Sequence, residues 1–363
     1  MLISDVDTPA LLIDLDRLNA NLDRAASLAR NADLKLRPHT KTHKTPQIAK
    51  KQIEKGASGV TVAKIAEAEV MADAGITDIF IAHQIVGRTK IERLISLAHR
   101  AQISVGVDSP QAATPLSMAF AQAGMRLRVL IEVDIGLHRC GVPPQDVSDL
   151  AYDINTLPGL ALCGAFTYPG QVYASRSENE VAGIAAYECR IMAEFTSQLG
   201  HLCDADPIIS GGSTPTASHY HFACGLTEMR PGTYVFNDRT QIDRWAATPD
   251  GCALTVLATV VSTPETGRAI LDAGSKALTS DLARESPGYG MLKEDNSAVL
   301  AQINEEHGFL DLSNADLKLR VGDKVEVIPN HSCVVTNLFD EAHVVKSGEI
   351  LETWPIAGRG KSQ

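Results

Sequence analysis

The feature that most constrains the fold of this 363-residue chain is a regular alternation of short apolar runs with helix-favouring stretches. Several of the runs are almost continuously apolar, as is typical of parallel strands buried on both faces. The eight runs span residues 34–39, 59–63, 78–83, 103–108, 128–134, 162–168, 207–213 and 229–236. Eight strand–helix units within this length predict a (β/α)8 barrel.

Stretches with helix signals separate these runs. Thr45 and Pro46 provide a capping residue followed by a proline suited to the first turn. The stretch 64–75 is rich in Ala and Glu and stops at a glycine, and the stretch 177–200 is the longest helix candidate. A doubly wound sheet is the alternative fold, but the first run is followed by RPHTKTHK and not by the glycine-rich fingerprint of such sheets.

The pattern changes after about residue 245, where few helix candidates remain. Short strand-like runs separated by turn residues follow, at 253–263, 268–274, 298–303, 323–329 and 349–354. An early apolar run at 10–15 precedes the barrel pattern, and we expect it to pair with this β-rich part. We therefore predict a barrel domain at residues 16–245 and a β-rich domain formed by residues 1–15 and 246–363.

The bulk composition is that of an ordinary globular protein, with 44% hydrophobic and 21% charged residues. The formal net charge of −11 argues against nucleic acid or an anionic membrane as the main partner. No apolar run is long enough to span a bilayer, and the acidic first residues do not resemble a signal peptide. The seven cysteines are odd in number and form no CxxC pair, so we expect a cytoplasmic protein without a disulfide framework.

The basic segment after the first run contains a candidate reactive lysine. Lys41 follows the predicted first strand at its carboxyl end, where barrel enzymes carry catalytic groups. Cationic neighbours such as Arg37 and Lys44 would disfavour the ammonium form and lower the pKa of Lys41. A neutral amine is what Schiff-base chemistry needs. A solvated basic loop explains the same residues, so this segment alone leaves both interpretations open.

A candidate anion-binding loop follows the seventh run, in SGGSTPT at 210–216. The glycines allow close approach of the backbone, and the N–H groups of Gly212 and Ser213 are expected to point at a phosphate at a helix N-terminus. Barrel phosphate sites commonly use the loops after strands seven and eight. Tyr234, in the eighth run, offers a hydroxyl as a further donor. A plain Gly-Ser turn and a core aromatic are the alternatives.

A second candidate segment, EVDIGLHRCG, follows the fifth run. Asp134 and Arg139 could both line the mouth of the barrel. As a permanent cation, Arg139 would hinder protonation of a pyridine nitrogen beside it. A surface salt bridge is the more common explanation of a single arginine.

The β-rich part contains a candidate metal pair in PNHSC. His331 and Cys333 lie two apart, so on a strand their side chains would share one face. Imidazole and thiolate suit Zn²⁺, and two protein ligands leave positions open for water or substrate. A buried histidine beside a buried cysteine is the alternative. A zinc site at His39 and His43 is a weaker interpretation, because no Glu follows the first histidine and Lys41 lies between them.

Together these segments resemble the D-serine dehydratase and D-threonine aldolase family of pyridoxal-phosphate enzymes. Its fold is the alanine-racemase-like barrel followed by a β domain, known as fold type III. Eight motifs in the same order carry the resemblance along nearly the whole chain: DTPALLIDLD, LRPHTKTHK, EVDIGLHRCG, SGGSTPT, RPGTYVFND, LDAGSKALTSD, EEHG and PNHSC. Any one motif would be a weak signal, whereas the ordered set is specific.

The resemblance implies roles for the candidate residues. Lys41 would be the catalytic Schiff-base lysine, and Arg139 would lie beside the pyridine nitrogen. The cofactor-binding residues that it implies are Lys41, Arg139, Tyr168, Gly211, Gly212, Ser213 and Tyr234. His331 and Cys333 would bind a divalent metal beside the cofactor, with zinc expected first and magnesium or manganese as alternatives.

The family divides by reaction, and the metal pair favours one branch. Its dehydratases share His-x-Cys with this sequence, whereas its aldolases tend to have His-x-Asp. We therefore predict a pyridoxal-phosphate- and metal-dependent dehydratase of D-β-hydroxy amino acids such as D-serine, D-threonine or 3-hydroxyaspartate, giving a 2-oxo acid and ammonia. The alternative is aldolase cleavage to glycine and an aldehyde. A racemase fits less well because no second base is marked, and a cofactor carrier fits less well because such relatives lack a β domain. We expect a homodimer whose partner is a small-molecule D-amino acid substrate.

Overall fold

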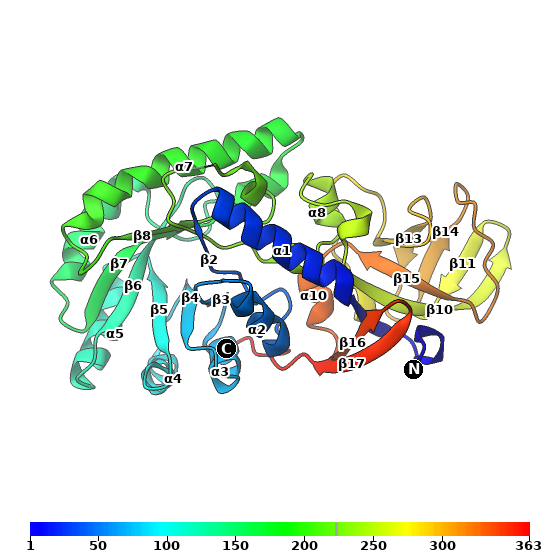
Figure 1. Ribbon diagram of the computed structural model, residues 1–363, viewed down its shortest axis with the longest axis horizontal. Coiled ribbons are helices and arrows are strands. Elements are labelled where there is room, and N and C mark those ends of the chain that lie inside the picture. Colours follow the sequence, from blue (N-terminus) through cyan, green and yellow to red (C-terminus); the bar gives the residue numbers. More distant parts are fainter. Residues whose placement is uncertain (222–223) are drawn as a thin grey trace. The chain divides into compact units, whose positions relative to one another are not determined.

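The computed structural model describes residues 1–221 and 224–363, which form two compact units. The barrel unit consists of residues 24–41, 48–232 and 361–363, and the β unit consists of residues 1–23, 42–47 and 233–360. By these contacts, segments 16–23, 42–47 and 233–245 belong to the β unit, although we assigned them to the barrel domain. Figure 1 labels most of the helices and strands of the two units.

The barrel unit contains an eight-stranded parallel sheet in the order β2-β9-β8-β7-β6-β5-β4-β3. Its strands are β2 (Lys35–Leu36), β3 (Val60–Val62), β4 (Asp78–Gln84), β5 (Gln102–Val107), β6 (Leu127–Val133), β7 (Leu160–Thr167), β8 (Ile208–Gly211) and β9 (Glu228–Met229). A bridge between His39 and Thr61 joins the chain after β2 to β3, so the two ends of the sheet meet. The predicted parallel barrel is therefore confirmed, because each of the eight apolar runs contributes a strand.

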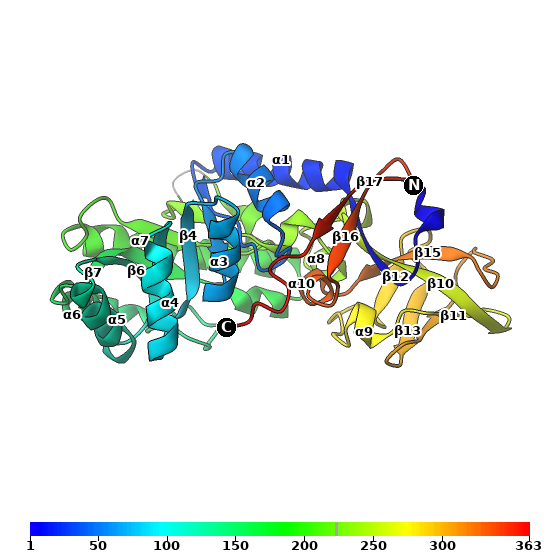
Figure 2. The ribbon, with the colours of Figure 1, turned by 90° about the horizontal axis from the view of Figure 1, so that it is seen from below.

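Helices pack against these strands, and consecutive helices from α3 to α7 contact one another (Figure 2). Their bounds are α1 (Leu15–Asn31), α2 (Pro46–Glu54), α3 (Ile65–Asp73), α4 (Arg88–Ala98), α5 (Pro110–Gln122), α6 (Val147–Asn155) and α7 (Glu178–Gly200). The hydroxyl of Ser177 caps α7 by accepting the N–H of Glu180, which satisfies one of the unpaired donors of the first turn. None of the helices within the described residues is long and apolar enough to cross a membrane.

The end of the barrel differs from the sequence-based expectation in two places. The eighth strand, β9, stops at Met229, because Pro231 has no N–H to continue the ladder. Tyr234 therefore lies in a short 3-10 helix, Thr233–Val235, and not on the eighth barrel strand. The helix expected after Gly212 is likewise only one 3-10 turn, Thr216–His219.

The β unit is built on a nine-stranded sheet in the order β11-β14-β13-β12-β15-β10-β1-β16-β17. Its strands are β1 (Ala10–Asp14), β10 (Leu254–Glu265), β11 (Arg268–Leu271), β12 (Gly290–Leu292), β13 (Val299–Ile303), β14 (Gly308–Asp311), β15 (Lys324–Pro329), β16 (Glu341–Lys346) and β17 (Glu349–Pro355). An additional antiparallel pairing of β10 with β11 closes the strands from β11 to β10 into an antiparallel barrel. As expected, β1 joins this sheet, antiparallel to β10 and parallel to β16.

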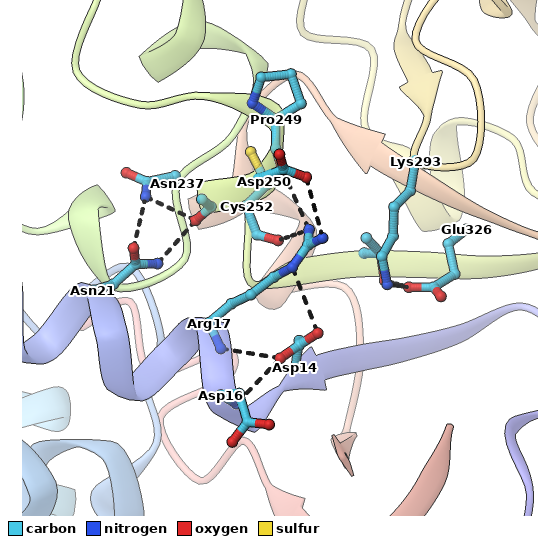
Figure 3. A network of polar contacts seen from close by, with 12 residues as sticks. Asp14, Asp16, Arg17, Asn21, Asn237, Pro249, Asp250, Cys252, Lys293 and Glu326 are labelled. Atoms are coloured by element: carbon cyan, nitrogen blue, oxygen red, sulfur yellow. Dashed lines mark hydrogen bonds and ion pairs between the residues drawn. The ribbon is translucent and has the colours of Figure 1, made fainter. Parts of the chain in front are cut away.

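Side chains at the start of α1 bind the backbone that leads into β10 (Figure 3). Arg17 donates to the carbonyl of Cys252 at 3.2 Å, and Asn21 donates to the carbonyl of Gly251 at 2.9 Å. Asn237 donates to the same Gly251 carbonyl at 2.9 Å. Buried carbonyls need such donors, so these bonds fix the N-terminal segment within the β unit.

Candidate active site

Three of the predicted cofactor-binding residues meet in the barrel unit. The Nζ atom of Lys41 lies 5.6 Å from the ring centroid of Tyr168, and the guanidinium carbon of Arg139 lies 5.2 Å from the same centroid. Tyr168 directly follows β7, Arg139 lies in the loop after β6, and Lys41 follows β2. All three therefore lie beyond the carboxyl ends of barrel strands, where barrel enzymes place their catalytic groups.

The positive charge near Lys41 is lower than the sequence predicts. Arg37 is buried and forms ion pairs with Asp78 at 2.7 Å and with Glu228 at 2.6 Å. Two carboxylates thus offset its charge, so Arg37 does not supply the free cation that we expected beside Lys41. No local sequence pattern indicates these ion pairs, because Glu228 and Asp78 lie 191 and 41 residues from Arg37 along the chain.

The two histidines of the basic segment have local roles. Nδ1 of His39 accepts the backbone N–H of Lys41 at 3.3 Å, and Nδ1 of His43 accepts the backbone N–H of Thr45 at 3.1 Å. In both cases a ring nitrogen bonds the N–H two residues further on. This shared turn geometry explains both residues without the weaker zinc interpretation.

Arg139 is oriented by a carboxyl group of the barrel. Its guanidinium lies 3.8 Å from Glu132, which is buried and also accepts a hydrogen bond from the amide of Gln84. Burial raises the pKa of Glu132. Asp134 instead accepts the N–H groups of Gly136 and His138, so it shapes its own loop.

The predicted phosphate loop has a different donor arrangement from the one expected. Gly212 has a φ of +95°, a conformation that favours glycine. Its N–H donates to Oε1 of Glu188 at 2.7 Å, and the N–H of Ser213 donates to Oγ1 of Thr216 at 2.9 Å. Both N–H groups that we expected to face a phosphate are therefore bonded within the protein, while the hydroxyl of Ser213 lies beside them, 3.0 Å from Thr216.

Glu188 is a residue of this loop region that sequence reasoning missed. Its carboxyl group is fully buried and accepts the hydroxyl of Tyr220 at 2.5 Å. Burial raises the pKa of Glu188 to about 7. A signal was present, because Glu188 continues the apolar stripe of α7 between Ala185 and Met192 at helical spacing.

His331 and Cys333, the predicted metal pair, lie close together, but they do not share the face of a strand as we expected. His331 immediately precedes the short helix α10 (Ser332–Thr336) and Cys333 lies in its first turn, so the prediction that both lie on a strand is wrong. β15 ends at Pro329, and the turn of the helix brings the two side chains together. Burial opposes ionisation, but the hydrogen bond and charge of His331 lower the pKa of Cys333. Burial also opposes ionisation of His331 and so lowers its pKa, but Cys333 and neighbouring carboxylates outweigh burial and raise this pKa to about 10.

Neighbouring polar groups orient this pair. Oδ2 of Asp281 lies 2.8 Å from Nδ1 of His331, which leaves Nε2 for a metal. Oγ1 of Thr42 lies 3.1 Å from Sγ of Cys333, and Thr42 directly follows Lys41 in the sequence. An imidazole with a carboxylate on its other nitrogen, together with a thiolate, fits a divalent metal such as zinc. Asp281 was within a motif that carried the resemblance, but its sequence position did not reveal this contact.

Another group of possible metal ligands lies in the barrel unit. One ligand atom each from Asp108, Glu132 and Cys140 lies within 4.8 Å of the others. The guanidinium of Arg139 already lies beside Glu132, and exposed acidic groups often gather without a metal. We assign no metal to this group.

Comparison with protein families gives two matches that together cover most of the chain. Residues 13–240 match the family described as alanine racemase, N-terminal domain, and residues 253–345 match a D-serine dehydratase domain. The fold is similar to that of alanine racemase from Clostridium difficile, with a TM-score of 0.68 at 16% identity over 97% of this chain and 99% of the other. The alanine-racemase-like fold, a parallel barrel with an antiparallel β-barrel domain, is thus confirmed.

Similar proteins of described activity belong to two reaction types. The chain is 36% identical to a D-threonine aldolase of Arthrobacter sp., over 99% of this chain and 95% of that protein. It is 33% identical to a D-threo-3-hydroxyaspartate dehydratase of Delftia sp., over 96% of this chain and 97% of that protein. The crystal structure of a D-threonine aldolase from Filomicrobium marinum matches with a TM-score of 0.90 at 33% identity, over 100% and 99% of the two chains.

Solved structures of the D-threo-3-hydroxyaspartate dehydratase include two informative variants. Each matches this chain with a TM-score of 0.91 at 30% identity, over 98% of this chain. One has alanine in place of a cysteine and is in a metal-free form. The other has alanine in place of a histidine two positions earlier in that protein.

Proposed function

Because this chain belongs to the D-threonine aldolase and D-serine dehydratase family of pyridoxal-phosphate lyases, we propose that it dehydrates D-β-hydroxy amino acids to a 2-oxo acid and ammonia. The observation that carries this choice is the pairing of His331 with Cys333. The dehydratase relative has a histidine and a cysteine at the same spacing, and the form without that cysteine is metal-free. The family resemblance implies an aspartate in place of the cysteine in the aldolases.

In this proposal, residues of the barrel unit hold the cofactor. Pyridoxal phosphate, when bound, supplies an electron sink for the negative charge that develops at Cα of the substrate. Lys41 would hold the cofactor through its amine and would accept the proton that leaves Cα, for which the amine must be neutral. Arg139 would lie beside the pyridine nitrogen, where its permanent positive charge would disfavour protonation of that nitrogen. Tyr168, which contacts both cations, would pack against the ring of the cofactor.

We propose that the loop of Gly211, Gly212 and Ser213 binds the phosphate, with Tyr234 as a further predicted donor. Glycine at position 212 is required by its positive φ. The N–H groups of Gly212 and Ser213 are fixed by acceptors within the protein, so we assign the hydroxyl of Ser213 as the phosphate donor of this loop, which it becomes by turning from Oγ1 of Thr216, 3.0 Å away.

His331 and Cys333 are the residues that would hold a divalent metal. A metal with open coordination positions is a Lewis acid that makes the β-hydroxyl a better leaving group. Asp281 holds the imidazole of His331 in the tautomer whose Nε2 can bind the metal. Loss of the Cα proton and the β-hydroxyl removes one water from the substrate, and hydrolysis of the resulting enamine then releases ammonia and the 2-oxo acid.

D-Threonine distinguishes the two reactions of the family by product. Dehydration gives 2-oxobutanoate and ammonia, whereas aldolase cleavage gives glycine and acetaldehyde. We expect 2-oxobutanoate as the main product, and we expect chelation to abolish its formation while the cofactor stays bound, because Lys41 and the phosphate loop do not need the metal. If the native enzyme gives mainly glycine and acetaldehyde, the aldolase function replaces the proposed dehydratase function. The 36% identity to a D-threonine aldolase favours this alternative.

Two variants of Cys333 separate metal binding from reaction type. Cys333→Ala removes a ligand, so we expect loss of elimination with the cofactor retained. Cys333→Asp keeps a ligand but changes it to the aldolase-like type, and we expect a larger share of glycine and acetaldehyde from D-threonine. Full-rate elimination by metal-free enzyme would rule out the metal mechanism.

A further inference from the structure

Glu188 ends a continuous chain of hydrogen bonds around the phosphate loop. One carboxyl oxygen accepts the N–H of Gly212 at 2.7 Å, and the other accepts the hydroxyl of Tyr220 at 2.5 Å. The same hydroxyl lies 2.8 Å from Oγ1 of Thr216, which accepts the N–H of Ser213 at 2.9 Å. We call Glu188, Tyr220 and Thr216 the loop bracket, because its two ends hold two successive N–H groups of the loop.

The loop bracket is buried within the barrel unit, beside α7. Glu188 and Thr216 are fully buried, and Tyr220 is 8% exposed. Burial of a carboxyl group is costly unless hydrogen bonds compensate, and here both oxygens have donors. Packing alone does not explain a carboxyl group at this position, since an apolar side chain of similar size would avoid the cost of burial.

The loop backbone lies directly against the loop bracket. A Cβ atom on Gly211 would lie 2.4 Å from Oε1 of Glu188, and a Cβ atom on Gly212 would lie 3.2 Å from the ring of Tyr220. The glycines therefore allow the close approach that the hydrogen bonds require. The contact fixes the positions of both backbone and bracket.

We infer that Glu188 is a positioning residue for the phosphate of pyridoxal phosphate, which acts through the backbone of Gly212 and Ser213. This inference rests on the proposed function, because it requires the phosphate to bind at this loop. The loop bracket uses the two N–H groups, and the hydroxyl of Ser213 would have to turn from Oγ1 of Thr216, 3.0 Å away, to donate to the phosphate. A direct contact of Glu188 with the phosphate would be repulsive whenever the carboxyl group is ionised, so its role is to hold the loop.

The test is the affinity of full-length protein for pyridoxal phosphate, measured by titration of visible absorbance, with activity measured at saturating cofactor. Glu188→Leu removes both acceptors, and we expect affinity to fall about tenfold or more. Glu188→Gln keeps an acceptor for Gly212 and an amide for Tyr220, so we expect a change within about threefold. Glu194→Leu, at an exposed position of the same helix, is the matched control and should leave the affinity unchanged.

A second variant keeps the test decisive if Glu188→Leu does not fold. Tyr220→Phe removes the donor to Glu188 and breaks the bracket while preserving ring packing. We expect weaker cofactor affinity with nearly normal turnover at saturating cofactor, a split that a general loss of folding would not produce. Normal affinity in Glu188→Leu, or in Tyr220→Phe where Glu188→Leu does not fold, would overturn the inference. Wild-type protein that binds no pyridoxal phosphate would instead overturn the proposed function.

Discussion

Lys41 is the residue on which the proposed chemistry depends, and its position can be tested chemically. Its amine faces the ring of Tyr168, which Arg139 also contacts. We expect borohydride reduction of the holoenzyme to attach the cofactor covalently to Lys41, located by peptide mapping, and Lys41→Ala to lose this attachment. Attachment to Lys44 or Lys276 would contradict the assignment, and Lys276 is a suitable comparison because it is committed to ion pairs with Glu305 and Glu306.

Asp281 provides a second prediction at the scale of single residues. Its carboxylate bonds Nδ1 of His331 at 2.8 Å, the contact that orients a histidine ligand toward a metal. Asp281→Asn should weaken metal affinity about 10- to 100-fold, because carboxylate partners of metal-binding histidines have effects of this size. Competition with a chromophoric zinc chelator measures the affinity directly. An unchanged zinc affinity would remove the orienting role of Asp281, whatever the activity of the variant.

These residues also indicate which parts of a site a sequence can reveal. His331 and Cys333 were identifiable because two metal-ligand types lie two positions apart in the chain. Their geometry was not, because the sequence did not reveal that the strand ends at Pro329 and a short helix follows. Glu188 and Asp281 act through partners 24 and 50 residues away, and no local pattern reports such contacts.

At the scale of elements, the phosphate loop is a turn that depends on one glycine. Gly212 has a φ of +95°, where a branched side chain is strained, and a Cβ atom would meet Tyr220 at 3.2 Å. Gly212→Val should therefore distort the loop and weaken cofactor binding strongly, by about tenfold or more. Gly183→Ala in α7 is the control, because nothing lies within 4 Å of its added Cβ atom. Equal, small effects from both changes would indicate an ordinary turn without a phosphate role.

The strands were predictable wherever burial on both faces produced a continuous apolar run. The predicted run at 128–134 corresponds to β6 (Leu127–Val133), whose last five residues are all buried. The eighth run was misjudged because its apolar residues continue past Pro231 into the 3-10 helix that holds Tyr234. Short strands such as β12 (Gly290–Leu292) had too few residues for a period-two signal.

At the scale of the whole molecule, the order of the elements made the two-part architecture predictable. Eight alternating units require a parallel sheet with helical crossovers, and the later strands without helices require antiparallel pairing. The placement of β1 beside β10 joins positions more than 240 residues apart, as in the pair Leu11 and Val256. Only its apolar character and its place before the first barrel helix suggested that it belonged to the β unit.

The stability of the fold should carry a pH dependence that originates at Glu188. Burial raises its pKa from the ordinary 4.5 to about 7, and Cys224 adds to the increase, while Tyr220, the N–H of Gly212 and the charge of Arg230 oppose it. Between these two pKa values the folded chain binds more protons at this carboxyl group than the unfolded chain does. The free energy of unfolding therefore falls as the pH rises from 4.5 through 7, by about 3 kcal/mol from this group.

Glu188→Gln isolates this contribution, because the amide is neutral at every pH while all other groups titrate as in wild type. We expect the free energy of unfolding of wild type, relative to the Gln variant, to decline between pH 4.5 and 8 by about 3 kcal/mol. Urea unfolding of both proteins in cofactor-free buffer measures the two curves. Parallel curves would mean that the carboxyl group ionises as easily in the folded barrel as in the unfolded chain, which would conflict with its complete burial.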